Sequence, residues 1–301
     1  MKEYIGAVLF VDILGISALT TSDKPLVTDL DFKALSKKSK ETSGNQFFCA
    51  RLLSRFRSNL HECKVDDLKI AQLSDCAFLW SRNESLVVRA ARQIFQKNTE
   101  TGIFARGGMA YGQIIEPEKT RLSLGQFICG KAVTRAAQLE AMGKGARVFI
   151  DRDIGGRQID GISSSAFEGM PNPSDYRMID EFIWFSCPAE FSDHAEKITR
   201  LKELVRILVR FRSCPSFRWN AASLHGRIHL GATIERLSKA ATELCEAVKV
   251  SPPCFAMQTS EIFQEMYKDD QYSVQEHQRD SIKFKNWARQ MAAPQRKRPS
   301  V

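Results

Sequence analysis

Residues 10–17 read Phe-Val-Asp-Ile-Leu-Gly-Ile-Ser, and the interpretation of the whole chain starts from them. An apolar run of strand length, residues 4–11, leads into a single acid, Asp12, and Gly15 then permits a tight turn. The pattern predicts a buried strand with a carboxylate at its C-terminal tip, followed by a helix. The backbone N–H groups of Gly15, Ile16 and Ser17 would open that helix and form a cradle for phosphate.

Asp12 has two interpretations on this octapeptide alone. In the first, Asp12 holds a divalent cation between itself and a bound phosphate, because the acid would otherwise repel the anion. In the second, Asp12 only caps the helix that follows. The remainder of the chain has to decide between a nucleotide site and a helix cap.

The composition is that of a globular protein with enough residues for one large domain or two of ordinary size. The chain has 301 residues, of which 43% are hydrophobic and 26% are charged. No apolar run approaches the roughly 20 residues that a membrane span needs. The N-terminus has no apolar signal region, and the eight cysteines form no C-x-x-C pair. We therefore expect a cytoplasmic protein with reduced thiols and no membrane span.

The formal charge of +9 is concentrated in the C-terminal third. Residues 191–301 carry 19 Lys and Arg against 12 Asp and Glu. A basic surplus is one feature of nucleic-acid-binding proteins. Here the charges are dispersed along helical segments, which favours a solvated face and argues against nucleic acid as a partner.

Residues 1–187 show alternating strand and helix patterns. Helical spacing of apolar residues predicts helices over residues 47–63, 84–98 and 130–142. Short apolar or glycine-bearing runs predict strands at residues 67–73, 76–80, 104–115, 147–150 and 178–185. Asp75 lies in the tight turn of the hairpin formed by the first two of these runs. The order predicts an α+β domain with an antiparallel sheet and helices packed on it.

Pro188 ends that pattern, and only helical patterns follow. Helices are predicted at about 193–212, 221–250 and 261–291. We interpret residues 191–293 as a small helical C-terminal domain of unknown role. The basic tail, residues 294–301, is expected to be disordered.

Four motifs in a fixed order resemble the class III nucleotide cyclase domain. They are residues 10–17, quoted above, then Lys69-Ile-Ala-Gln-Leu-Ser-Asp75, Ala105-Arg-Gly-Gly-Met-Ala-Tyr-Gly112 and Cys129-Gly-Lys-Ala-Val-Thr-Arg-Ala-Ala-Gln-Leu-Glu140. The resemblance covers about residues 1–187 and implies a ferredoxin-like βαββαβ sheet domain. Within the class, the chain looks most like the pyrimidine cyclases of bacterial Pycsar antiphage systems.

The resemblance implies a site with two divalent cations, Mn²⁺ or Mg²⁺. Asp12 and Asp75 match the two acids that bind the ions in the family, and the main-chain carbonyl of Ile13 completes one ion's shell. Arg106 matches the family's phosphate-binding arginine, and a guanidinium suits that role because its paired donors can clamp phosphate oxygens. The alternative for Arg106 is a partly buried arginine paired with an acid.

Two departures from the family concern the base of the nucleotide. Ala71 stands where adenylate cyclases carry an adenine-reading lysine, and Phe127 stands where they carry its aspartate partner. Loss of a buried hydrogen-bonding pair removes discrimination of about 10⁴-fold. A different or relaxed base specificity is therefore implied, and the resemblance points to pyrimidines.

Two further departures concern the helix at residues 130–142. Thr134 and Gln138 match the family's transition-state asparagine and arginine, and they lie one helical turn apart on one face. Neither is positively charged, so the developing charge would fall to Arg106, the metal ions or Arg135. The alternative is that Thr134 and Gln138 are ordinary surface residues. Lys144 and Arg177 are candidates for the family's second phosphate lysine.

The leading functional hypothesis is a uridylate cyclase that converts UTP to 3′,5′-cyclic UMP and pyrophosphate. The runner-up is a cytidylate cyclase, followed by an ATP or GTP cyclase and by a degenerate fold that serves as a nucleotide-binding or interaction module. The resemblance also implies a homodimer with sites at its interface, and a separate effector that responds to the cyclic product in antiphage defence.

Overall fold

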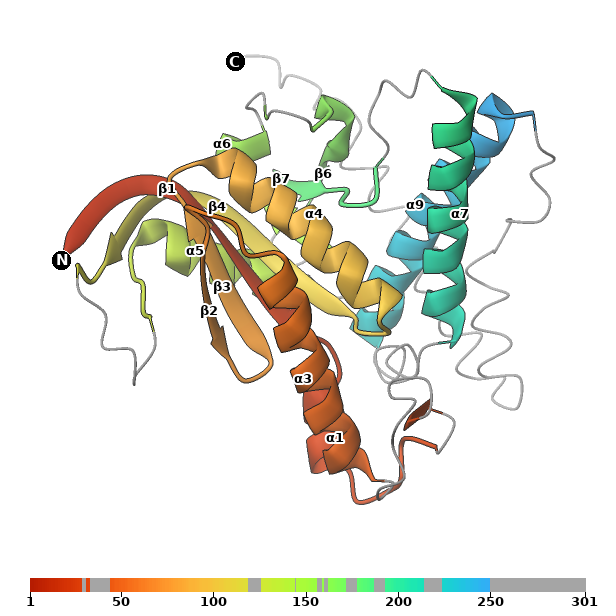
Figure 1. Cartoon of the computed structure of the whole chain (residues 1–301), viewed down its shortest axis with the longest axis horizontal. Helices are drawn as coiled ribbons and strands as arrows, with labels where there is room; N and C mark the ends of the chain where they lie inside the picture. Colours follow the sequence, from red (N-terminus) through yellow and green to blue (C-terminus); the bar gives the residue numbers. More distant parts are fainter. Residues whose placement is uncertain are drawn as a thin grey trace, which may run out of the picture.

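The computed structural model describes residues 1–28, 31–32, 44–118, 126–143, 145–155, 159, 162–171, 178–186, 193–213 and 224–249. Its centre is a seven-stranded sheet in the order β2-β3-β1-β4-β5-β7-β6 (Figure 1). The strands are β1 (Lys2–Ile13), β2 (Lys69–Leu73), β3 (Cys76–Ser81), β4 (Ala105–Glu116), β5 (Val148–Ile150), β6 (Phe167–Pro171) and β7 (Met178–Phe182). The α+β class predicted from the sequence is confirmed.

The sheet differs from the prediction at one pair of strands. β4 and β5 run parallel, whereas every other neighbouring pair is antiparallel. The pair is parallel because α5 (Lys131–Met142) crosses over between the two strands. The predicted antiparallel sheet thus contains one parallel pair, and the sheet is mixed.

The helices cover the two faces of the sheet unequally. The alternation of β1 places Ala7, Leu9 and Val11 in the larger core and Val8 in the smaller one. The larger core also takes residues from the long helices α3 (Asn45–Glu62), α4 (Glu84–Glu100), α7 (His194–Ser213) and α9 (Leu224–Ala247). The smaller core is covered by α5. The remaining helical elements are α1 (Ile16–Thr21), α6 (Arg152–Gly155) and the 3-10 turn η2 (Ser164–Ala166).

The helix α5 lies directly on the backbone of β4. A Cβ atom at Gly108 would come within 2.0 Å of the carbonyl oxygen of Ala136 and 2.3 Å of the nitrogen of Glu140. Only glycine permits this approach. Gly108 of the motif at residues 105–112 thus lets α5 lie close to the strand that carries Arg106.

The C-terminal helices pack against the sheet domain. Leu204 of α7 and Leu237 of α9 are fully buried in the same core as β1, and Phe211 stacks on Phe104 with ring centroids 4.4 Å apart. In Figure 1, α7 and α9 stand side by side next to α4. The boundary between two domains near residue 188 stays a prediction. The helix predicted at residues 261–291 and the tail at 294–301 lie outside the described residues.

None of the helices in the described part of the chain has both the length and the apolar character of a membrane span.

Candidate functional site

Asp12 lies one residue before the end of β1, between two neighbouring strands. It is in register with Cys76 on β3 and with Arg106 on β4. The alternation of the strand turns its side chain toward the face that α5 covers. The helix α1 begins after Gly15 and has no side-chain capping bond, so the interpretation of Asp12 as a helix cap is wrong.

Asp75 is fixed beside the end of β1. It follows Ser74, whose φ of 55° makes the tight turn between β2 and β3. The backbone N–H of Ile13 donates to the carbonyl oxygen of Asp75 at 2.9 Å. The hairpin predicted from the sequence thus brings the second acid to the same edge of the sheet as Asp12.

Arg106 connects Asp12 to the helix α5. Its Nε and Nη2 donate to Asp12 Oδ2 at 3.2 and 3.1 Å, and its Nη1 donates to the carbonyl oxygen of Gly143 at 3.4 Å. Arg106 Nε also forms an ion pair with Glu140 Oε1. Pairing with an acid is the alternative that the sequence left open for Arg106, and its role toward phosphate stays a prediction.

Glu140 is a member of this cluster that sequence reasoning did not assign to the site. It lies on the last turns of α5, and its side chain is only 6% exposed. A signal was present, because Glu140 follows the buried Ala132 and Ala136 at four-residue spacing on the apolar side of α5. A charged residue in an apolar stripe indicates a buried partner, which here is Arg106.

Arg106 does not fully stabilise the ionised forms of the two carboxyl groups that it contacts, those of Asp12 and Glu140. Burial raises the pKa of Asp12 above its ordinary value, and this outweighs the opposing effect of Arg106. Burial and the charge of Asp12 raise the pKa of Glu140 from 4.5 to about 7, again against the effect of Arg106. The charge of nearby Asp75 raises the pKa of Asp12 further. The single positive charge of Arg106 is thus too small to balance two ionised carboxylates, those of Asp12 and Glu140.

This donor set fits a divalent cation. Carboxylate oxygens are the ligands that Mg²⁺ and Mn²⁺ prefer, and a cation between Asp12 and Asp75 would relieve their repulsion. Within the described residues, no group of three or more His, Cys, Asp or Glu side chains is arranged to hold a metal. A cation at Asp12 and Asp75 would therefore take its remaining ligands from a backbone carbonyl such as that of Ile13, from a bound phosphate or from water.

Thr134, Arg135 and Gln138 form a second group of predicted site residues. They line an open hollow of about 440 Å³ together with Gln113, Gly130 and Lys131. Thr134 and Gln138 are exposed, and Nε of Arg135 lies 3.6 Å from Oδ2 of Asp151. Lys131 is a cation in this hollow that sequence reasoning did not single out. The exposure leaves Thr134 and Gln138 available to a ligand but does not distinguish them from ordinary surface residues.

The two groups lie on opposite sides of α5. Glu140 faces β4 and Arg106, whereas Thr134 and Gln138 are exposed. The hollow also reaches Gln113, which faces Ile5 and lies seven residues along β4 from Arg106, roughly 23 Å. Within one chain, the acids at the sheet edge and the exposed residues of α5 therefore do not form one compact site.

The positions predicted to read the base differ in exposure. Ala71 faces Phe78 across the β2–β3 pair and packs beside Phe10 and Phe78 on the α5 side of the sheet. Phe127 precedes α5, and 56% of its surface is exposed.

The residues predicted to cradle phosphate are Gly15, Ile16 and Ser17. Gly15 is the N-cap residue of α1, and Ile16 and Ser17 begin the helix, where Ser17 is exposed. Lys144 and Arg177 lie outside the described residues.

No protein-family model matches the sequence, and no curated protein matches it. Among solved structures, the guanylyl cyclase Cya2 is 9% identical at a TM-score of 0.43, with 60% of this chain and 91% of that chain covered. The guanylate cyclase domain of RhGC from Catenaria anguillulae, in complex with GTP, is 15% identical at a TM-score of 0.41, covering 60% and 97%. A bacterial light-regulated adenylyl cyclase is 17% identical at a TM-score of 0.37, covering 60% and 90%.

Proposed function

We propose that this chain is a metal-dependent nucleotide cyclase. The observation that carries the proposal is the cluster of Asp12, Asp75, Arg106 and Glu140 at one edge of the sheet, where the carboxyl groups lack sufficient positive charge. The order of the four sequence motifs supports the same function. Both observations come from this chain's own residues.

Each residue of the cluster has a role in this proposal. Asp12, Asp75 and the carbonyl of Ile13 hold two Mn²⁺ or Mg²⁺ ions, which, when bound, supply activation of the ribose 3′-hydroxyl and neutralisation of the triphosphate. Arg106 has donors directed at the same edge and binds phosphate oxygens when a substrate is present. Gly15, Ile16 and Ser17 supply backbone donors next to them.

A homodimer explains the separation between the two groups of site residues. The acids of one chain and the α5 surface of a second chain would meet across the interface, giving two symmetric sites. Thr134, Gln138, Arg135 and Lys131 would then face the substrate from the partner side. A cation in that group matters because Thr134 and Gln138 carry no charge.

Mixing two inactive variants tests this arrangement. Asp12→Asn breaks the first group, and the double variant Thr134→Ala with Gln138→Ala breaks the second. A mixture should recover about one quarter of the wild-type activity, because half of the dimers are mixed and each has one intact site of two. Activity is measured after the variants are mixed, refolded together and compared with each variant alone. No recovery above the separate variants would contradict a shared site.

We propose UTP as the substrate, with cyclic UMP and pyrophosphate as products and CTP as the runner-up. The support is that Ala71 and Phe127 replace both polar groups that read adenine in adenylate cyclases. Ala71 lies among the apolar residues Phe10 and Phe78 and offers no side-chain hydrogen bond to a base. The role of the cyclic product as a signal to a separate antiphage effector rests on the resemblance of the motifs.

The decisive assay incubates the full-length protein with Mn²⁺ and each of the four nucleoside triphosphates separately. Cyclic product is identified by mass, and pyrophosphate is measured in the same reactions. Cyclic UMP as the main product is the expected result. Product from ATP or GTP alone would overturn the pyrimidine assignment. Absence of product from all four would favour the nucleotide-binding module, in which the ion pair with Arg106 prevents Asp12 from binding a metal ion.

A further inference from the structure

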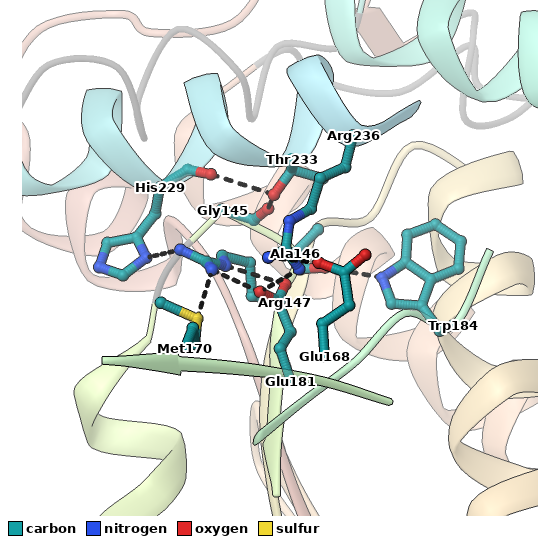
Figure 2. A network of polar contacts seen from close by, with 10 residues as sticks. All are labelled: Gly145, Ala146, Arg147, Glu168, Met170, Glu181, Trp184, His229, Thr233 and Arg236. Carbon is teal, nitrogen blue, oxygen red and sulfur yellow. Dashed lines mark hydrogen bonds and ion pairs between the residues drawn. The ribbon is translucent and has the colours of Figure 1, made fainter. Parts of the chain in front are cut away.

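The connection between α5 and β5 is in direct contact with the C-terminal helix α9. Gly145, in this connection, has a φ of +73°, and a Cβ atom there would come within 2.5 Å of the backbone of His229 and Leu230. Thr233 Oγ1 of α9 donates to the carbonyl oxygen of Gly145 at 2.5 Å (Figure 2). The backbone of the connection and the backbone of α9 therefore touch at a buried point.

The residues that follow Gly145 are held as well. Trp184 Nε1 donates to the carbonyl oxygen of Ala146 at 2.8 Å. Arg147 is only 2% exposed, donates to Glu181 of β7 through Nε at 2.9 Å, and has its Nη1 2.9 Å from His229 Nδ1. The entry to β5 is thus fixed from both β7 and α9.

Arg236 of α9 completes the buried network. Its Nη1 lies 2.6 Å from Glu181 Oε2, and its Nη2 lies 2.8 Å from Glu168 Oε2. Figure 2 shows Arg147, which directly precedes β5, and Arg236 of α9 converging on Glu181. Burial alone would raise the pKa of Glu181, but the two guanidinium groups lower it. This network is fully compensated, so its charges favour the docked position of α9.

The same connection leads back to the candidate site. The helix α5 ends at Met142, and the carbonyl of Gly143 accepts from Arg106 Nη1. Glu140, on the same end of α5, is ion-paired with Arg106. The backbone of α5 packs directly on β4 at Gly108, so a displacement of this end of the helix changes the contacts of Arg106.

We propose that α9 is a positioning element of the candidate site, and that Thr233 and Arg236 hold the α5–β5 connection where Glu140 and Gly143 fix Arg106. The effect on substrate rests on the proposed function, whereas the mechanical coupling does not. In this view α9 acts on the candidate site only through the α5–β5 connection. A shift of α9 would then change the position of Arg106, the residue proposed to bind phosphate.

The first test measures backbone hydrogen exchange in the full-length protein without nucleotide. Thr233→Val removes the donor to Gly145 and keeps the shape of the side chain. Exchange at residues 138–143 and 145–147 should become about tenfold faster, because a local contact that protects them is lost. Thr233→Ser should restore protection, and Lys239→Ala, on the exposed side of α9, should leave it unchanged. Faster exchange confined to α9 would overturn the proposal.

Arg236→Gln breaks the same docking independently, because it removes the charge that reaches Glu181. It should raise exchange at residues 138–143 in the same way as Thr233→Val. A rise at β7 without a rise at the end of α5 would contradict the coupling.

The second test uses the nucleotide that supports turnover. Thr233→Val should raise KM about tenfold and lower kcat less, because the misplaced group is proposed to bind phosphate. In an Arg106→Lys background the same substitution should add little, since coupled residues are not additive. Fully additive losses would mean general destabilisation and would overturn the proposal. If the wild type forms no product, the proposed function fails, while the exchange experiment still decides the coupling.

Discussion

Two ion clusters of this protein differ in how their buried carboxyl groups are paired. At the candidate site one guanidinium, Arg106, is shared by Asp12 and Glu140. In the network under α9 the buried carboxylate of Glu181 contacts both Arg147 and Arg236, and Arg236 also contacts the half-exposed Glu168. The pKa values follow this difference, because those of Asp12 and Glu140 are raised whereas that of Glu181 is lowered.

The difference distinguishes a cluster that holds the fold from one that is prepared for a ligand. A buried carboxylate with two cationic partners is satisfied, and removing one member leaves an unpaired charge. Buried carboxyl groups that share one cation gain from a further positive charge, and perturbed pKa values of this kind often accompany functional sites. The three predictions below test that contrast.

The largest effect is expected on turnover when the acids of the candidate site are removed. Asp12→Ala or Asp75→Ala should lower the cyclisation rate by at least about 10³-fold, because a metal ion supplies several kcal/mol of transition-state stabilisation. The circular-dichroism spectrum should stay that of a folded protein. Asp66→Ala, at an exposed acid before β2, is the control. Equal loss of activity and of the folded signal would make the two acids structural.

The next effect is on stability when the satisfied cluster is broken. Glu181→Gln should lower the free energy of unfolding by about 3–5 kcal/mol, because it leaves Arg147 buried without its counter-charge. Urea denaturation measures this change. Glu168→Gln is the matched control, since Glu168 contacts the same Arg236 but is half exposed, and it should cost less than about 1 kcal/mol. Similar losses in both variants would show that burial does not separate the two acids.

The smallest effect is a pH dependence of stability in metal-free protein. The pKa of Glu140 is raised from 4.5 to about 7, so the folded state binds its proton more tightly than the unfolded state. Its contribution is therefore present below about pH 4.5 and is lost as the pH rises through about 7, by at most about 3 kcal/mol. Glu140→Gln should flatten the stability curve between these pH values, as measured by thermal unfolding in a chelating buffer. An unchanged slope would show that Glu140 does not cause the pH dependence of stability.

Some elements and contacts of the sheet could not be predicted from the sequence. The strand β6, Phe167–Pro171, contains glycine and ends on proline, so it lacks the apolar alternation of a strand and is stabilised by its pairing with β7. The predicted strand at residues 178–185 ends early, at Phe182, and Trp184 turns away to bind the carbonyl of Ala146. The first difference depends on pairing with the neighbouring strand β7, and the second depends on Ala146, which is 38 residues away in the sequence.

The sequence by itself determined that Asp12 and Asp75 stand at the tip of a buried strand and in a hairpin turn, because strand length, apolar content and turn residues are local properties. It also determined the α+β class from the order of such segments. Only the tertiary structure decided that Arg106 pairs with both Asp12 and Glu140, that α5 packs on β4 at Gly108, and that Thr233 of α9 donates to the carbonyl of Gly145. Those contacts depend on burial and on close approach between segments up to 88 residues apart, which no local pattern encodes.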